Sequence, residues 1–127
     1  MIDLKAGMYI KSTAALNGSY FEHTTILIVE HNDKGSLGFV INKPLNKSLH
    51  ELIEFNHSKP FPLMAGGPVD NDHLFVLHKR PDFIDGGEEI SNGFYLGGNM
   101  AQVIEAINTI GANKQEIQLF IGYCGWD

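Results

Sequence analysis

The region that most constrains the fold lies between residues 24 and 44, where two apolar segments flank a short polar turn. Residues 26–29, Ile-Leu-Ile-Val, form an unbroken apolar run, as in a strand that is buried on both faces. The Asn-Asp-Lys-Gly sequence at 32–35 has the residues of a hairpin turn. We therefore expect the strands 24–30 and 37–42 to be antiparallel neighbours in the core.

Apolar segments of strand length recur along the rest of the chain. Each is bounded by glycine, proline or polar residues, and they predict strands at 7–11, 61–65, 74–77, 94–96 and 117–121. The chain therefore consists mainly of strands.

Two helices are predicted between these strands. Ser48 and Glu51 have the spacing of a capping box, which predicts a short helix through about Phe55. The inward-facing residues of this helix would be Leu49, Leu52 and Ile53. Asn99 has the position of an N-cap for a second helix, which Gly111 would end. The apolar stripe of the second helix consists of Val103, Ile104, Ile107 and Ile110.

The length and the order of elements indicate one domain. A chain of 127 residues is large enough to bury a core without disulfides, and no linker or repeat interrupts it. Strands with two helices among them favour an α/β fold of the α+β type. We expect a single compact domain over 1–127, with a mixed, largely antiparallel sheet and two or more helices.

The charge of the chain argues against binding to nucleic acid. The formal net charge is −6, from 15 acidic and 9 basic residues. The lysines are scattered singly, and the one basic cluster is His78-Lys79-Arg80. Duplex binding depends on Lys and Arg side chains that neutralise phosphates, so direct nucleic-acid binding is not expected.

The sequence also predicts a cytoplasmic location. Cys124 is the one cysteine and cannot form an internal disulfide, which is typical of a reducing compartment, although pairing with a second chain stays open. The N-terminal residues lack the basic and apolar regions of a signal peptide, and the longest apolar runs are too short to span a membrane. We expect a cytoplasmic protein that makes no membrane contact.

Polar side chains and glycines gather where the predicted strands end. We select nine of them as a candidate binding patch: Glu30, His31, Asn32, Asn42, Gly66, Gly67, Pro68, His78 and Cys124. The glycines of this set would form a backbone corner, because they tolerate positive φ. No complete catalytic set accompanies these residues, so we predict a non-enzymatic regulatory or binding module. Its partner would be a protein or a small molecule, and no cofactor or metal is expected.

An enzymatic alternative depends on Cys124. Gly122 and Gly125 lie on either side of it at a strand end. There His31 or His78 could lower the pKa of its thiol and make it the nucleophile of a hydrolase or thiol-dependent enzyme. Burial as a packing residue is the competing explanation for a free cysteine. For His31 and His78, the competing role is to end the hydrogen-bond ladder of a strand.

Two other patterns have simpler explanations that we prefer. His50, Glu54 and His57 would share one face of a continuous helix at metal-ligand spacing, but a solvated polar face explains all three. Gly97-Gly98-Asn99 precedes a helix N-terminus, which favours an anion, but a turn at the glycines and capping by Asn99 explain it.

Three segments, taken in order, match one family. They are Glu30-His31-Asn32 with the Gly35 to Pro44 segment, Gly66-Gly67-Pro68-Val69 leading to Phe75-Val-Leu-His78, and Gly122-Tyr-Cys-Gly-Trp126. In these motifs, and in their spacing from about Leu4 to the end, the chain resembles the YqgE/AlgH family of small bacterial proteins. The resemblance implies a cytosolic α/β domain of uncommon mixed-sheet topology. It implies no established activity or cofactor, and it brings a regulator label with a link to alginate production.

The chain departs from the family pattern at three places. His23 stands where an arginine is usual, and Cys124 stands where alanine is usual. Similar proteins continue past the tryptophan through a Gly-Gln-Leu-Glu segment into a further amphipathic region, whereas this chain ends at Asp127. We therefore expect a family domain without the C-terminal segment, whose uncovered surface could drive homo-oligomer formation.

Overall fold

The computed structural model describes residues 5–11, 24–91 and 93–126, so His23 lies outside the described residues. The chain divides into two compact units. The first consists of Met1–Pro44, Met64–Leu74 and Phe120–Asp127, and the second of Leu45–Leu63 and Phe75–Leu119.

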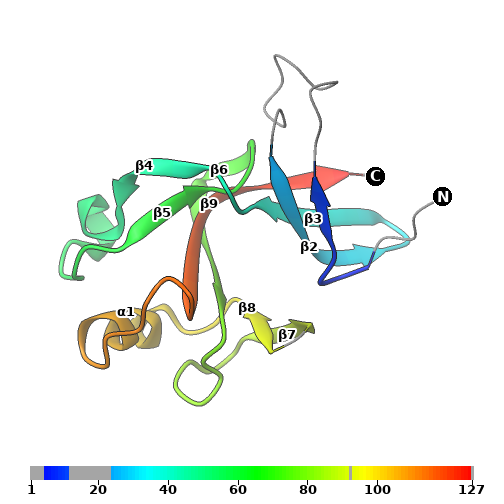
Figure 1. The fold of residues 1–127 in the computed structure, drawn as a ribbon. Coiled ribbons are helices and arrows are strands. Elements are labelled where there is room, and N and C mark those ends of the chain that lie inside the picture. The colour runs from blue at the N-terminus through cyan, green and yellow to red at the C-terminus, as the bar shows by residue number, and fades with distance from the viewer. Residues whose placement is uncertain (1–4, 12–23, 92, 127) are drawn as a thin grey trace. The chain divides into compact units, whose positions relative to one another are not determined.

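The first unit is built on an antiparallel sheet in the order β1-β2-β3-β9 (Figure 1). The bounds of these strands are β1 Tyr9–Lys11, β2 Thr25–Asn32, β3 Gly35–Val40 and β9 Ile117–Trp126. The predicted hairpin is confirmed, because Asn32 pairs with Gly35 across a two-residue turn. Residues 26–29 are all less than 5% exposed, as their unbroken apolar run predicts.

A β-bulge interrupts the β2–β3 pairing. Ile28 pairs with Gly38, but Glu30 pairs with Leu37, which leaves Val29 as the extra residue of β2. Ile28 and Val29 are both buried, and Glu30 is exposed. Bulges of this kind bend the strand and change the direction of its side chains.

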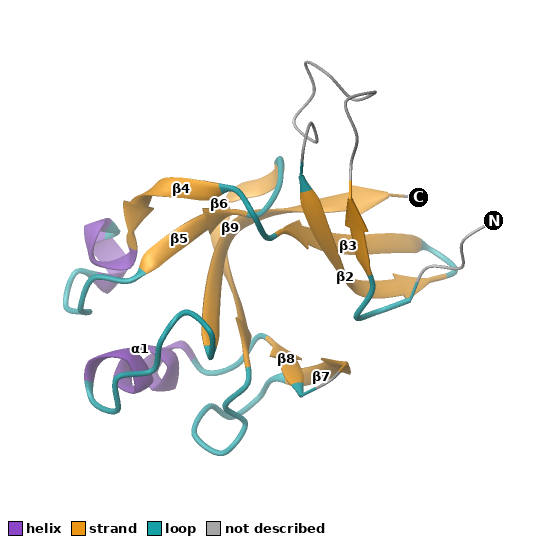
Figure 2. Cartoon of the chain, viewed as in Figure 1, coloured by secondary structure: helices purple, strands orange, loops and turns teal. Residues whose placement is uncertain are grey.

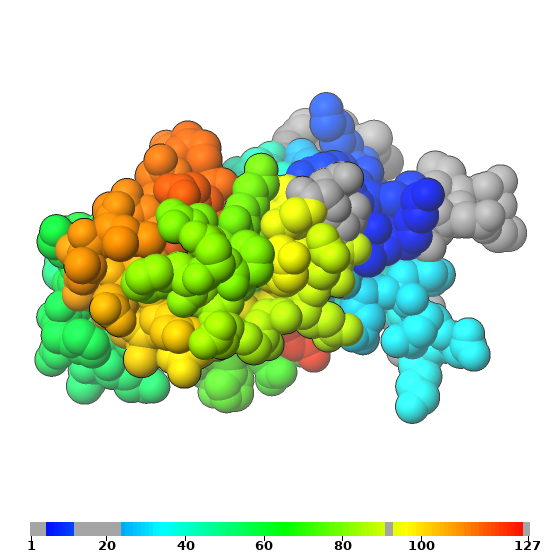
Figure 3. Space-filling model, turned by 90° about the horizontal axis from the view of Figure 1, so that it is seen from below, coloured from blue at the N-terminus to red at the C-terminus, as the bar shows by residue number. Residues whose placement is uncertain are grey.

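The second unit contains a smaller antiparallel sheet and the helix. Its strand order is β6-β8-β7, from Val69–His78, Phe94–Leu96 and Glu88–Ser91, and the part of β6 in this unit begins at Phe75. β4 (Pro44–Ser48) pairs with β5 (Pro62–Ala65), and each of these strands crosses a boundary between the units. Figure 3 shows the segment after β6 and the segment that leads into the helix, coloured light green to yellow, at the surface of this unit.

The one α-helix of the described residues is α1, Met100–Asn108, and it confirms the second predicted helix (Figure 2). Asn99 is its N-cap, and the Asn99 side chain accepts a hydrogen bond from the N–H of Gln102 at 3.1 Å. The buried stripe includes Val103, Ile104 and Ile107. Ile110 is 42% exposed, because the helix ends before it reaches this position.

The first predicted helix is wrong. Residues 49–51 and 53–55 form two single 3₁₀ turns, and Leu52 between them has extended backbone angles of φ −81° and ψ 131°. The capping box of Ser48 and Glu51 does form, but single turns gain too few hydrogen bonds to continue as a helix. The residues expected to point inward therefore differ in burial: Leu49 is buried, whereas Ile53 is 90% exposed.

The fold is therefore of the α+β type with mostly antiparallel pairing, and the described residues contain one α-helix in place of the two or more that were expected. Pro44 begins β4, and β4 and β7 were not predicted. Among the described helices, none has the length and apolar character needed to cross a membrane.

Candidate functional site

His78 is the most unusual polar residue of the second unit. It is the last residue of β6, it pairs with Tyr95 of β8, and it is 0% exposed. Its ring stacks on the ring of Tyr95, with 5.7 Å between the centroids. An imidazole in such a position is held by packing on the strand and by its neighbours on the sheet.

The hydrogen bonds of the His78 ring define where its proton lies. Nδ1 accepts a hydrogen bond from the backbone N–H of Arg80 at 3.0 Å, so the neutral ring carries its proton on Nε2. Burial lowers the pKa of His78, which keeps the ring neutral at neutral pH. The Nε2 atom has no hydrogen-bond partner among the described residues. The Gly97 carbonyl raises this pKa and so opposes part of the effect of burial. Its position relative to Nε2, however, does not have the geometry of a hydrogen bond.

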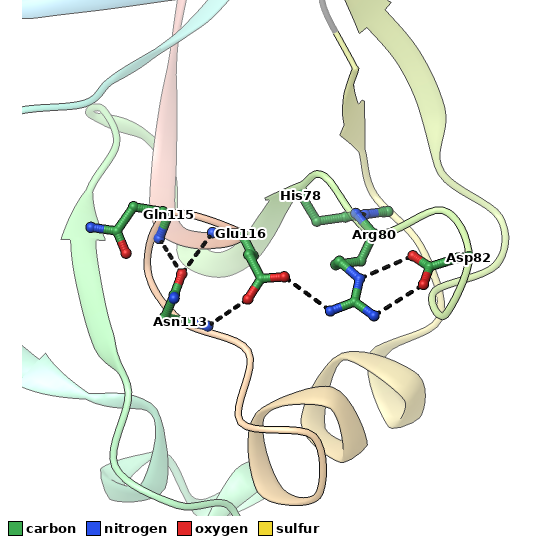
Figure 4. A network of polar contacts seen from close by, with 6 residues as sticks. All are labelled: His78, Arg80, Asp82, Asn113, Gln115 and Glu116. Atoms are coloured by element: carbon green, nitrogen blue, oxygen red, sulfur yellow. Dashed lines mark hydrogen bonds and ion pairs between the residues drawn. The ribbon is translucent and has the colours of Figure 1, made fainter.

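The side chain of Arg80 is bound by two carboxylates (Figure 4). Nε and Nη2 each donate to Asp82 at 3.0 Å, and Nη1 donates to Glu116 at 2.9 Å. These hydrogen bonds raise the pKa of Arg80, and the bond from Arg80 lowers the pKa of Asp82. These contacts fix the backbone directly after His78. They therefore hold the backbone N–H of Arg80 in position to donate to Nδ1 of His78.

The loop of Glu116 has its own support. Asn113 Oδ1 accepts from the N–H groups of Gln115 and Glu116, at 3.0 and 3.2 Å. The Asn113 N–H in turn donates to Glu116 Oε1 at 3.4 Å. Glu116 thus reaches Arg80 from a rigid turn. The sequence offered no indication of this pair, because the two residues are 36 positions apart.

In the first unit, Glu30 and His31 are exposed at the end of β2, directly after the bulge. His31 pairs with Ser36 of β3, and its Nδ1 shares a hydrogen bond of 2.5 Å with Ser36 Oγ. We call Glu30 and His31 the hairpin corner. The ring of His31 is held in one orientation while it remains accessible.

Asn32 and Asn42 use their side chains to fix the backbone. Asn32 Oδ1 accepts from the N–H of Lys34 at 2.8 Å, which closes the hairpin turn. Asn42 Oδ1 accepts from the N–H of Thr25 at 2.8 Å, 17 residues earlier in the chain. Both predicted site residues therefore have a structural role.

Gly66 and Gly67 allow a close approach to β9. A Cβ at Gly66 would lie 2.4 Å from the carbonyl oxygen of Gly122, and a Cβ at Gly67 would lie 2.1 Å from that of Tyr123. Gly66 and Gly67 are buried, and Pro68 after them is exposed. The predicted corner exists, but the two glycines serve backbone packing, not positive φ, since neither is among the positive-φ residues.

Cys124 is 0% exposed, and its Sγ donates to the Gly66 carbonyl at 3.4 Å. Burial raises the pKa of its thiol to about 11, the opposite of what an activated thiolate needs. Within the same unit, the ring of His31 is engaged with Ser36. The packing explanation therefore fits Cys124 better than the nucleophile explanation does.

This arrangement predicts that Cys124 reacts very slowly with a thiol reagent. We expect 5,5′-dithiobis(2-nitrobenzoate) at pH 7.5 to label the folded chain at least about 100 times more slowly than the chain in urea, because a neutral buried thiol is a poor nucleophile. The measurement is the absorbance of the released thiolate over time. Labelling of the folded chain at the rate of the unfolded chain would contradict the buried position.

Eight of the nine predicted site residues belong to the first unit, and Gly66, Gly67 and Cys124 lie against one another there. His78 belongs to the second unit. That all nine form one patch stays a prediction. Arg80, Asp82 and Glu116 were not selected from the sequence, although Arg80 is the single arginine of the chain and follows a predicted strand.

Asp70, Asp72 and His73 form an exposed group that the sequence did not single out. One possible ligand atom of each lies within 4.8 Å of the others, and His73 Nδ1 is 3.2 Å from Asp72 Oδ1. Exposed acidic groups of this kind are common without a metal ion. The group carries no assignment.

A family model described as AlgH-like matches residues 9–127. The chain belongs to the AlgH-like family. Among relatives, a UPF0301 protein of Chlorobaculum parvum is 41% identical over 123 residues, or 97% of this chain and 66% of that protein. A UPF0301 protein of Bacteroides fragilis is 37% identical over 95% of this chain and 62% of its own length. This AlgH-like chain thus spans slightly less than two thirds of these relatives.

Two solved structures have a similar fold. Protein DIP2367 from Corynebacterium diphtheriae has a TM-score of 0.76 at 19% identity, over 98% of this chain and 68% of that one. The AlgH protein from Pseudomonas aeruginosa has a TM-score of 0.68 at 25% identity, over 94% of this chain and 66% of that one. The resemblance read from the three motifs is therefore confirmed, and the AlgH-like family is one whose function is uncharacterised.

Proposed function

We propose that this AlgH-like chain is a non-enzymatic regulatory or binding module of the cytoplasm, which recognises a partner through the hairpin corner. The observation that carries the proposal is the bulge at Val29, after which Glu30 and His31 are exposed while the strand before them stays buried. Bulges that redirect side chains are common beside functional sites. The bond between His31 and Ser36 limits the motion of the ring. A side chain that is already ordered loses less conformational entropy on binding.

The chemistry of the corner suits a polar partner. Glu30 and His31 are consecutive residues of β2, so their side chains leave opposite faces of the strand. The corner can accept a hydrogen bond through Glu30 and either accept or donate through His31. Neither residue is used in the core, and Asn32 fixes the turn beside them. The other polar candidates of the first unit serve the backbone, which leaves these two side chains available for recognition. A transcription-related role would act through such a partner, since the charge of −6 opposes direct contact with DNA.

The test is a comparison of two double variants in an affinity capture. Glu30→Gln with His31→Ala changes the corner, and Glu54→Gln with His57→Ala changes the same exposed residue types elsewhere. Any captured protein or metabolite is identified by mass spectrometry, and its Kd is measured by calorimetry. We expect the corner variant to bind at least about 10-fold more weakly, equal to about 1.4 kcal/mol, and the control to bind as the unchanged protein does.

Equal Kd values for the corner variant and the unchanged protein would overturn the corner as the binding surface. The absence of any specific partner, together with an unchanged melting temperature across a metabolite panel, would overturn the binding function itself. Sedimentation of the purified chain shows whether a second copy is the partner, in which case the corner variant should shift the dimer to monomer.

A further inference from the structure

The proton-bearing Nε2 of His78 faces glycine backbone. A Cβ at Gly87 would lie 2.9 Å from Nε2, and a Cβ at Gly98 would lie 3.5 Å from it. The Gly97 carbonyl is 3.1 Å from the same Cβ position at Gly87. Nε2 thus lies beside two glycine-containing segments, one after β6 and one before α1, and the side chains of Tyr95 and Ile84 pack close to the same positions.

The second of these segments opens the α1 helix. Gly98 is followed by the N-cap Asn99 and by Met100, the first residue of α1. The first N–H groups of a helix have no partner within it. The Asn99 side chain accepts from the N–H of Gln102, and the Asn99 carbonyl accepts from the N–H of Val103. The N–H groups of Met100 and Ala101 therefore remain at the positive end of the helix dipole.

A buried N–H without a partner is costly, and most native donors of this kind are paired. His78 cannot be satisfied by turning its ring, because Nδ1 already accepts from Arg80, which is itself held by Asp82 and Glu116. The chain thus keeps one donor of His78 unused, fixed in place, and directed at the segment that begins a helix. An acceptor that comes from outside the chain would remove this cost.

We propose that the second unit binds a small oxyanion, as a carboxylate or a phosphate group, between the Nε2–H of His78 and the N-terminal N–H groups of α1. Gly87 and Gly98 have no side chain next to Nε2, so a displacement of this backbone, together with the neighbouring Ile84 side chain, admits one oxygen atom to Nε2. The other oxygens then face the helix N-terminus, where anions are favoured. This site uses neither Glu30 nor His31, so it is independent of the hairpin corner.

The acidic residues nearby set the charge of the ligand. Asp82 is neutralised by Arg80, and Asp85 receives a hydrogen bond from Gln102 Nε2 at 3.1 Å. Asp85 is exposed, and its carboxylate repels an anion of high charge. A singly charged carboxylate is therefore expected to bind more tightly than a doubly charged phosphate.

The test is a titration followed by NMR on the whole chain labelled with ¹⁵N. The ligands are sodium acetate and inorganic phosphate, with sodium chloride at the same ionic strength as the reference. We expect the imidazole spectrum to show the proton on Nε2. The Nε2 signal of His78 and the amide signals of Gly98, Met100 and Ala101 should then shift with one common Kd on the order of 1 to 10 mM, as a few charge-assisted hydrogen bonds allow.

Two variants and one control complete the test. Gly87→Ala places a methyl group 2.9 Å from Nε2, and His78→Asn keeps an acceptor near the Nδ1 position but loses the Nε2 donor. Both should weaken the common Kd at least about 10-fold or abolish the shifts. Gly111→Ala adds its methyl group where no atom lies within 4 Å, and it should bind as the unchanged protein does.

Several results would overturn the proposal even if Gly87→Ala and His78→Asn fail to fold. One is a proton on Nδ1 in the unchanged protein. Another is an Nε2 signal that does not shift in the presence of up to about 100 mM acetate or phosphate. This is the result expected if the Nε2–H donates to a buried water molecule and to no anion. A third is a shift of the α1 amides without His78, which would indicate attraction by the helix end alone. Acetate shifts without phosphate shifts would support a carboxylate ligand, and the reverse would support a phosphate ligand.

Discussion

Gly67→Ala is expected to lower the free energy of unfolding by at least about 3 kcal/mol, which is a large part of the stability of a small domain. The added Cβ would lie 2.1 Å from both the carbonyl carbon and the carbonyl oxygen of Tyr123, and 2.6 Å from the nitrogen of Cys124. These are backbone atoms of β9, so no rotamer change can relieve the contact. The strand itself must move, and overpacking of this kind is costly.

The matched control is Gly111→Ala. Gly111 has a φ of +70°, and an added Cβ there meets no atom within 4 Å. Alanine at this position is expected to lower the free energy of unfolding only through the left-handed conformation, by about 1 to 2 kcal/mol. Urea unfolding of both variants, followed by circular dichroism, measures the two costs. If Gly67→Ala costs no more than Gly111→Ala, the close approach of Gly67 to β9 does not exist in solution.

The strands could be predicted where local pattern and burial agree. The apolar run at 26–29 predicts burial on both faces, and the turn residues after it fix the hairpin, so β2 and β3 were found nearly at their observed bounds. The cap at Asn99 and the apolar stripe after it likewise predicted α1. In each case the interactions that decide the element lie within a few residues of one another.

The local sequence pattern gave a wrong prediction for the short segment 48–55, where an α-helix and single 3₁₀ turns begin in the same way. Ser48 and Glu51 form the capping box that a helix requires, yet the chain makes only single 3₁₀ turns and exposes Ile53. A cap satisfies N–H groups at the start of a helix, but it supplies none of the hydrogen bonds that extend it. The sequence pattern at 48–55 therefore identified the first turn and not its continuation.

The candidate site shows the same division between local and distant contacts. Asn32 and Asn42 were selected as presented polar groups, but each accepts a backbone N–H and holds the chain in place. His78 was selected as a site residue from its place at a strand end, but its burial depends on contacts with Tyr95 and with glycines that follow it by up to 20 residues. The ion pair between Arg80 and Glu116 spans 36 residues and has no local pattern. Polar residues at strand ends are thus recognisable from sequence, but their partners are not.

Phe120→Ala is expected to lower the free energy of unfolding by about 3 to 5 kcal/mol, as for other fully buried aromatic residues. Phe120 and Phe39 are both 0% exposed in the first unit, and their rings stack with 4.6 Å between centroids and 13° between planes. Gly66 makes room for this pair, because a Cβ there would lie 2.9 Å from Phe120 Cβ and 3.1 Å from Phe39 Cδ1. The motif glycine and the stacked rings therefore depend on one another.

The control for Phe120→Ala is Ile53→Ala, which removes a side chain that is 90% exposed and should change stability by less than about 0.5 kcal/mol. A double-mutant cycle of Phe39→Ala with Phe120→Ala separates the contact between the rings from the cavity that each change leaves. We expect a coupling of about 0.5 to 1.5 kcal/mol from the stacked pair. Costs that add without coupling would show that the two rings are buried separately, and the close approach of Gly66 would then serve its contact with Gly122 and not the ring pair.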